Sequence, residues 1–217
     1  MNKTFKYTND YVVSSEADKM ATQKKATEQA RFENIAKAVG GKHGYDRVGV
    51  ELSTYADFKM RWTRSYHWID FQVSDYMMGA PDEVVEDIFE CVFSRIEGTT
   101  REYSPATTDY LTANKFAQTH RATYLKRHKA ESEMFKEFHG AHVHFAKNEM
   151  DTSRIGFAST LMNTIILNPY LKEFDDEVIE NAIAHEYNVI QDGLSMFGKE
   201  GEQPVEYDIT ALRGFRL

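Results

Sequence analysis

A histidine and a glutamate stand side by side in residues 183–190, IAHEYNVI, where they could share a site for acid–base or metal chemistry. An imidazole can bind a zinc ion or move a proton, and a neighbouring carboxylate can activate a metal-bound water. Zinc sites with the spacing H-E-x-x-H use a second histidine one helical turn later, because both side chains then share one face. Here the second position is occupied by Val189, which has no donor atom.

The residues around this pair have the pattern of an amphipathic helix. At about 100° per residue, the apolar side chains form one stripe, made of Val178, Ile179, Ala182, Ile183, Val189 and Ile190. Glu186 falls near the middle of this stripe, where a carboxylate is costly unless a cation, a metal-bound water or several donors satisfy it. Glu186 is therefore expected either to be functional or to pair with an arginine such as Arg154 or Arg213.

A second pair of imidazoles, His142 and His144, stands in the run HVHF. If this run is a strand, both rings point to the same side and could bind one metal ion. Together with His185 they would form a three-histidine site. A solvated surface, or pairing with carboxylates, is the non-functional alternative for two histidines on a strand.

The composition limits the partners that the protein is expected to bind. The 217 residues carry 26 Lys and Arg against 34 Asp and Glu, a formal net charge of -8, so nucleic acid is not the expected partner. The single cysteine, Cys91, excludes an internal disulfide and a thiolate zinc site. No window approaches the roughly 18 apolar residues that span a bilayer, and the N-terminus lacks a signal-peptide pattern. We expect a soluble, cytoplasmic protein.

The elements of the first half are predicted from periodicity and from breaking residues. Residues 14–39 predict a helix that stops at Gly40 and Gly41 and lies outside the core. Alternating apolar residues in 47–53 and 58–74 predict two or three antiparallel strands. Pro81, followed by acidic residues, begins a helix that reaches Ile96.

The second half is expected to contain a helix, three strands and a final helix. Pro105 is placed in a loop, and residues 121–140 predict a helix. Turn-forming residues separate three apolar runs that are expected to be strands, at 141–147, 154–160 and 163–171. The last helix is predicted over 176–192, capped by Asp175 or Asp176 and closed by Gly193.

Residues 154–186, RIGFASTLMNTIILNPYLKEFDDEVIENAIAHE, resemble the zincin-type metallopeptidases of the gluzincin and minigluzincin kind, and the related SprT-type proteins. In those proteins a strand of similar pattern precedes the helix that carries H-E-x-x-H. Residues 66–96, YHWIDFQVSDYMMGAPDEVVEDIFECVFSRI, look like the N-terminal part of minigluzincin-like proteins. The similar pieces lie between Arg61 and Gly193.

The resemblance implies an α+β, zincin-like fold, with a small mixed sheet packed against a backing helix at 81–96 and an active-site-type helix at 176–192. It also implies two parts: an accessory N-terminal helix and first strand in residues 1–60, and a metallopeptidase-like domain in residues 61–217.

The resemblance also implies roles for individual residues. His185 matches the first zinc ligand and Glu186 matches the general base, whereas Val189 holds the position of the missing second ligand. The family takes its third ligand from a glutamate beyond the helix, for which the candidates are Glu200, Glu202 and Glu206. The family's cleft-lining strand, which can pair with an extended peptide substrate, matches Asn163, Thr164, Ile165 and Ile166.

These expectations leave several hypotheses open. The chain could be a metallopeptidase-like pseudoenzyme with impaired or lost proteolysis, without zinc, that binds peptides or proteins. It could instead be an active zinc-dependent hydrolase that uses His185, Glu186 and an unconventional second ligand. Val189 could also be a substitution for an ordinary histidine. The non-catalytic alternative is an α+β domain in which a buried glutamate pairs with an arginine.

Overall fold

The computed structural model describes residues 16–148, 150–151 and 153–215. Within these residues the chain forms five α-helices and two small sheets, so the predicted α+β class is confirmed. The helices are α1 (Glu16–Lys42), α2 (Asp82–Ile96), α3 (Pro105–Thr112), α4 (Asn114–Arg127) and α5 (Asp176–Ser195). The strands are β1 (Arg47–Ser53), β2 (Met60–Arg64), β3 (Trp68–Ser74), β4 (Lys136–Phe138), β5 (Ala141–Phe145), β6 (Gly156–Ser159) and β7 (Thr164–Leu167). Short 3₁₀ helices occur at η1 (Asp75–Met77), η2 (Pro169–Glu173) and η3 (Ile209–Leu212).

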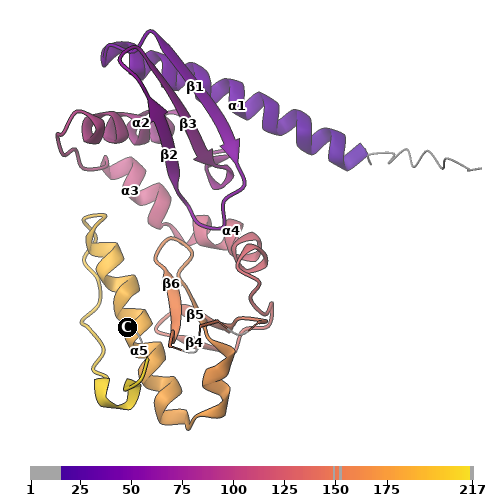
Figure 1. The fold of residues 1–217 in the computed structure, drawn as a ribbon, viewed down its shortest axis with the longest axis vertical. Helices are drawn as coiled ribbons and strands as arrows, with labels where there is room; N and C mark the ends of the chain where they lie inside the picture. Colours follow the sequence, from indigo (N-terminus) through magenta and orange to yellow (C-terminus); the bar gives the residue numbers. More distant parts are fainter. Residues whose placement is uncertain (1–15, 149, 152, 216–217) are drawn as a thin grey trace, which may run out of the picture.

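The first sheet has the strand order β1-β3-β2 and lies at one end of the long axis of the molecule (Figure 1). The three strands occur where the alternating pattern predicts them. β2 pairs with β3 in the antiparallel sense, but β1 pairs with β3 in parallel, so the all-antiparallel expectation was wrong for β1. Alternation predicts a strand and its buried face, but it carries no information about which neighbour a strand selects.

Helices α1 and α2 cover one face of this sheet. Phe71 of β3 makes edge-to-face contacts with Phe89 and Phe93 of α2, at ring-centroid distances of 5.1 and 5.4 Å, and such pairs contribute about 0.5–1.5 kcal/mol each beyond burial. Phe32 and Ala36 of α1 are fully buried, so α1 is not outside the core as predicted. Only its N-terminal part extends past the sheet (Figure 1).

Helix α1 also continues through the glycine pair that was expected to stop it. A Cβ at Gly40 would lie 2.6 Å from the Val48 side chain, so this glycine permits close packing of α1 on β1. Gly41 has free space around it. The left-handed conformation that ends the segment is adopted by Gly44, with φ of 79°.

The middle of the chain differs most from the prediction. Pro105 is the first residue of α3, where its missing N–H costs nothing, and the Ser104 hydroxyl accepts a hydrogen bond from the Thr107 N–H. The helix predicted at 121–140 is the second half of α4 and ends at Arg127. Beyond it, residues 136–138 form β4 because they pair with β5.

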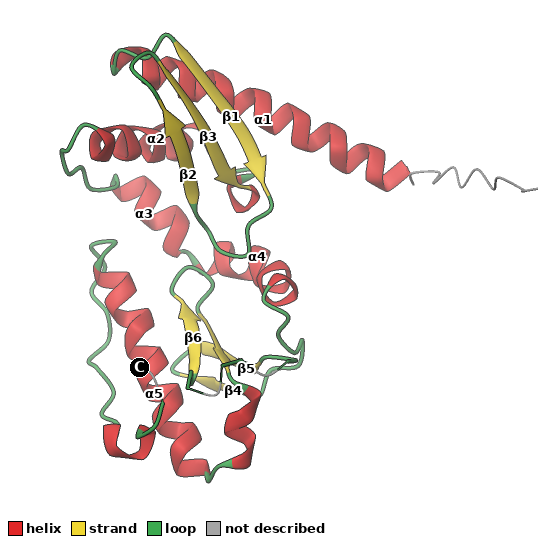
Figure 2. Cartoon of the chain, viewed as in Figure 1, coloured by secondary structure: helices red, strands yellow, loops and turns green. Residues whose placement is uncertain are grey.

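The second sheet has the order β4-β5-β7-β6 and lies between α4 and α5 (Figure 2). On the α5 side, Val143, Ile165 and Leu167 pack with Ile179 and Ile183. On the opposite side, apolar residues of the second sheet join the large core that α4 shares with the first sheet, among them Ile166, which packs with Tyr124 and Leu125. The second sheet is therefore the middle of three layers.

Two implications of the resemblance need correction. The helix at 81–96 packs on the first sheet, whereas α4 covers the back of the sheet that carries α5. The boundary expected between residues 60 and 61 falls inside β2 and would separate β1 from its partner β3. Residues 16–60 thus contribute to a core that includes α2, and the chain passes from one sheet to the other through α3 and α4.

Helix α5 occupies the predicted region but does not end at Gly193. A Cβ at Gly193 would lie 1.9 Å from the Thr160 hydroxyl oxygen and 2.9 Å from the Thr160 Cβ, so this glycine allows α5 to pass the turn between β6 and β7. The glycine has a packing role, and the helix extends to Ser195.

We expect Gly193→Ala to lower the free energy of unfolding by about 1–3 kcal/mol, because α5 must move away from Thr160. The matched control is Gly41→Ala, which introduces the same methyl group into a helix where nothing lies within 4 Å. That change should be neutral or stabilise by up to about 1 kcal/mol. Urea unfolding of both variants measures the difference, and equal effects would contradict the close approach.

Candidate functional site

A cleft of about 510 Å³ lies between α5 and the edge strand β6. One wall carries the three residues of the incomplete motif, and the other wall carries β6 and the loop before it. Its lining consists of Asp151, Ser153, Arg154, Gly156, Phe157, Ala158, His185, Glu186 and Val189. The structure therefore brings His185, Glu186 and the position of the missing ligand to one concave surface.

Val189 lines this cleft and does not belong to the buried stripe in which the helical pattern placed it. Its side chain is 43% exposed, whereas Ile190 next to it is buried. One helical turn separates Val189 from His185, so the two side chains share a face of α5. The valine stands where a second imidazole could face the same space as the first.

Glu186 is buried, with 6% exposure, at the cleft wall. Burial raises the pKa of its carboxyl to about 7, although the nearby positive charge of Arg154 acts in the opposite direction. Within the described part of the chain no cation lies close enough to Glu186 to form an ion pair. Arg213, the other arginine considered as a partner, is exposed and does not line the cleft.

His185 is half-buried, and burial lowers the pKa of its imidazole. Its Nδ1 lies 3.0 Å from the Tyr207 hydroxyl oxygen, within hydrogen-bond distance. This contact fixes the ring orientation and leaves Nε2 as the nitrogen available to the cleft. Because the ring is held at one nitrogen only, it could still act as a ligand, donor or acceptor through the other.

Tyr207 belongs to an extended segment, residues 201–208, which we call the strap. The strap runs back along α5 and is held by side-chain amides of that helix. The side chain of Asn188 makes two hydrogen bonds with the backbone of Val205. Its Nδ2 donates to the carbonyl and its Oδ1 accepts from the N–H, both at 2.9 Å. Gln191 accepts from the Glu202 N–H at 2.8 Å, and Asn181 accepts from the Asp208 N–H at 2.5 Å.

His142 and His144 do not join His185, so the three-histidine site is excluded by the fold. Alternate residues of β5 face opposite sides of the sheet, and Val143 faces α5. His142 is on the other face, where its Nε2 lies 3.1 Å from Nη1 of Arg121 in α4. His144 is buried on that same face, and its Nδ1 lies near two backbone carbonyls, those of Glu131 and Glu133.

The downstream glutamates are also separated from the cleft. Glu200 and Glu202 line a different hollow together with His139 and Tyr187, and Glu202 accepts a 2.8 Å hydrogen bond from the Tyr187 hydroxyl. Glu206 is exposed on the strap and does not line the cleft. In residues 16–148, 150–151 and 153–215, no three His, Cys, Asp or Glu side chains are arranged to hold a metal ion.

The strand expected to pair with a peptide has no free edge. Thr164, Ile165 and Ile166 are buried in β7, which lies between β5 and β6 and pairs with both. Asn163 precedes β7 in a left-handed turn conformation, with φ of 46°, and its amide binds the Gly140 carbonyl. The edge strands of this sheet are β4 and β6, and β6 is the one that lines the cleft beside α5, so the residues that the resemblance indicated are not at an edge.

The orientation of the β6 backbone follows from its pairing with β7. The Asn168 N–H donates to the Ile155 carbonyl, so the backbone groups of Ile155 point toward β7. Hydrogen-bonding groups alternate along an antiparallel strand. The backbone groups of Gly156 and Ala158 therefore point to the free edge, and the Gly156 carbonyl accepts a 3.1 Å hydrogen bond from Nε of Arg154.

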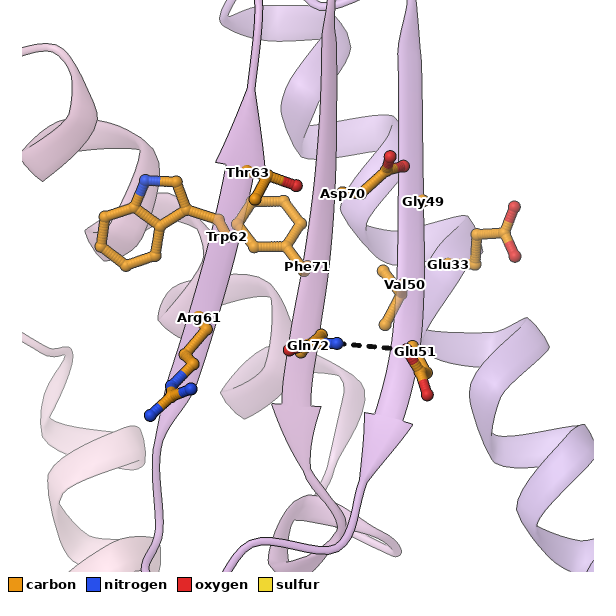
Figure 3. A pocket seen from close by; sticks show the side chains of 10 residues that line it. All are labelled: Glu33, Gly49, Val50, Glu51, Arg61, Trp62, Thr63, Asp70, Phe71 and Gln72. Atoms are coloured by element: carbon orange, nitrogen blue, oxygen red, sulfur yellow. Dashed lines mark hydrogen bonds between the residues drawn. The ribbon is translucent and has the colours of Figure 1, made fainter.

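A larger hollow, of about 640 Å³, lies on the first sheet (Figure 3). Several of its polar side chains have partners: Gln72 contacts Glu51 and Tyr55, and Asp70 pairs with Arg47. Sheets commonly leave one polar face to solvent, so this surface has a sufficient structural explanation. The α5–β6 cleft is the better candidate because it contains a buried ionisable side chain.

Sequence reasoning did not identify three features of the cleft region. Arg154 was considered only as an ion-pair partner, and neither Tyr207 nor the strap was singled out. The positions of Asn181, Asn188 and Gln191 place three amides along one side of α5, and that spacing was available as a signal. No sequence pattern indicates that their partner is the backbone of a segment further along the chain.

Comparisons with known proteins do not assign the chain to a protein family. No family model matches it, and neither a curated protein nor a solved structure matches it. Among the described helices, none combines the length and the apolar character that crossing a membrane would require.

We expect the contribution of Glu186 to the free energy of unfolding to fall as pH rises from about 4.5 to 7, because unfolded Glu186 ionises near its ordinary pKa of 4.5 and the buried carboxyl ionises near 7. Below this window both forms are neutral, and above it the folded state bears a cost on the order of 3 kcal/mol. Glu186→Gln removes this cost.

Urea unfolding at pH 5 and pH 8 tests the assignment. Relative to the wild type, Glu186→Gln should be several times more stabilising at pH 8 than at pH 5. Glu200→Gln is the control, because that side chain is exposed. An unchanged pH dependence in Glu186→Gln would show that the carboxyl is not held in an unfavourable environment.

Proposed function

We propose that the protein is a metallopeptidase-like pseudoenzyme, with an incomplete zinc site and little or no proteolytic activity, that binds extended peptides in the cleft between α5 and β6. The observation that supports this most directly is the shared cleft of Glu186, Val189 and the free edge of β6. The acid that would activate a metal-bound water is in place, but the position of the second ligand carries an alkyl group.

The arrangement of the second sheet agrees with the zincin resemblance. A strand precedes the helix that bears His185 and Glu186, and an antiparallel edge strand lies beside that helix. An extended peptide could add to the edge strand through the outward-facing backbone groups of Gly156 and Ala158. Main-chain hydrogen bonds would then supply affinity without requiring a metal ion.

The active-hydrolase alternative lacks a ligand set in the described residues. His142 and His144 face α4, and the candidate glutamates line another hollow or lie on the surface. The residues at the cleft offer His185 as a single imidazole ligand, with Glu186 and Asp151 as carboxylates on its walls. A zinc site normally needs three protein ligands in a fixed geometry, so we favour peptide binding over hydrolysis.

Restoring the missing imidazole should create a zinc site. We expect Val189→His to bind zinc more tightly than the wild type, because the two imidazoles would lie one turn apart on the cleft face of α5. Titration calorimetry with zinc measures the difference. Met196→His adds an exposed histidine about three helical turns away from His185 and should leave zinc affinity unchanged.

Metal analysis and a protease assay on the wild type decide between the two functions. Stoichiometric zinc together with cleavage that Glu186→Gln abolishes would overturn the pseudoenzyme proposal. No zinc gain in Val189→His would show that the two positions do not face one metal.

Peptide binding through the β6 edge is tested with a synthetic probe. We expect a dye-labelled extended octapeptide of serine, threonine and valine to bind, and the same peptide with alternate backbone nitrogens methylated to lose most of its affinity. N-methylation removes the donors that β-addition requires and leaves the protein untouched. Fluorescence anisotropy measures both, and equal binding of the two peptides would exclude pairing at this edge.

A further inference from the structure

The loop before β6 holds an arginine beside the free edge in a way that the peptide-binding proposal alone does not explain. Asn168, which is fully buried, donates from its Nδ2 to the carbonyls of Asp151 and Arg154, at 3.1 and 2.8 Å. These two bonds tie the backbone of Asp151 and of Arg154 to the end of β7. The backbone that carries Arg154 is therefore fixed by the core of the domain.

The side chain of Arg154 is also oriented. Its Nε donates to the Gly156 carbonyl, and its guanidinium carbon lies 5.3 Å from the centre of the Phe157 ring. These contacts occupy Nε and one face of the guanidinium, so only one of its five donors is used. The two terminal nitrogens have no hydrogen-bond or ion-pair partner among the residues that the structure describes.

The environment of Arg154, which is exposed, differs from that of Arg127, which is half-buried. Arg127 of α4 binds both carboxylate oxygens of Asp75, at 2.7 and 2.6 Å. The fork formed by its two terminal nitrogens is therefore occupied by another residue of the protein. In the α5–β6 cleft Arg154 is held through Nε and its ring contact, and its two terminal nitrogens have no partner in the described residues. A planar guanidinium with two free nitrogens matches a carboxylate better than any other common peptide group.

We propose that Arg154 selects the peptide, and that the cleft binds extended peptides that place a carboxylate at the start of β6. This inference rests on the proposed function and names its ligand class. The carboxylate is either the C-terminus of the peptide or an aspartate or glutamate side chain. A strand that adds to β6 in the antiparallel sense has its C-terminal end next to residue 154, so a free C-terminus can reach the fork.

The experiment uses the full chain and four forms of the dye-labelled serine, threonine and valine octapeptide. One has a free C-terminal carboxylate, one has a C-terminal amide, one has the amide with a glutamate as its last residue, and one has the amide with a glutamine there. Affinities from anisotropy should be roughly tenfold or more higher for a carboxylate form than for its neutral partner. The free-acid and glutamate arms distinguish the two sources of the carboxylate.

Three variants assign the preference to Arg154. In Arg154→Gln the ratio of the affinities for the carboxylate and neutral peptides should fall to about one, while the neutral amide peptide still binds. Arg154→Lys keeps the charge but not the fork, so it should retain part of the preference. Arg64→Gln, an exposed arginine on β2, removes the same charge elsewhere and should leave the preference unchanged.

Each outcome bears on one claim. If no peptide form binds, the proposed function fails. If the neutral and carboxylate forms bind equally to the wild type, peptide binding stands and the role of Arg154 is overturned, even if Arg154→Gln fails to fold. A preference that Arg64→Gln removes as fully as Arg154→Gln would show general charge attraction and would also overturn the assignment.

Discussion

Keeping a carboxyl group inside an otherwise apolar helix face is the constraint around which the second half of the protein is organised. Glu186 lies among residues that pack on the second sheet, and the structure provides no ion pair to compensate it in the described residues. A buried acid of this kind favours its neutral form, because desolvation penalises the charge. Arg154 reduces this penalty from a distance but does not cancel it.

Such an arrangement costs stability, and a structural role alone does not require it. A leucine or glutamine at the same position would pack or hydrogen-bond without the penalty of an ionisable group. The acid is adjacent to a cleft, next to an oriented imidazole and opposite an unpaired sheet edge. Strongly shifted ionisable groups in clefts are typical of functional sites, which is why we propose a function for this cleft and not for the larger hollow of the first sheet.

Local patterns in the sequence predicted most helices and strands, but tertiary contacts determine how these elements pair and pack. The strands and the last helix were found because periodicity and capping are local properties. The sequence does not show that Gly193 meets Thr160, that Gly40 meets Val48, or that β1 pairs in parallel, since each depends on a distant segment. Val189 was placed in the core because an apolar residue at helical spacing is usually buried, and only the cleft reveals its exposure.

The strap is a covering segment that is held on α5 mainly by hydrogen bonds over short sequence separations. Its bonds to Asn181, Asn188 and Gln191 join residues only 11 to 27 positions apart. Hydrogen bonds of such short separation can break and re-form without parting the strands of either sheet. Val205 and Tyr207 also pack against the core of the second sheet, and a carboxylate oxygen of Glu202 lies 3.5 Å from Nδ1 of His139, so these contacts resist opening. The contact between His185 Nδ1 and the Tyr207 hydroxyl therefore lasts only while the strap stays docked on α5.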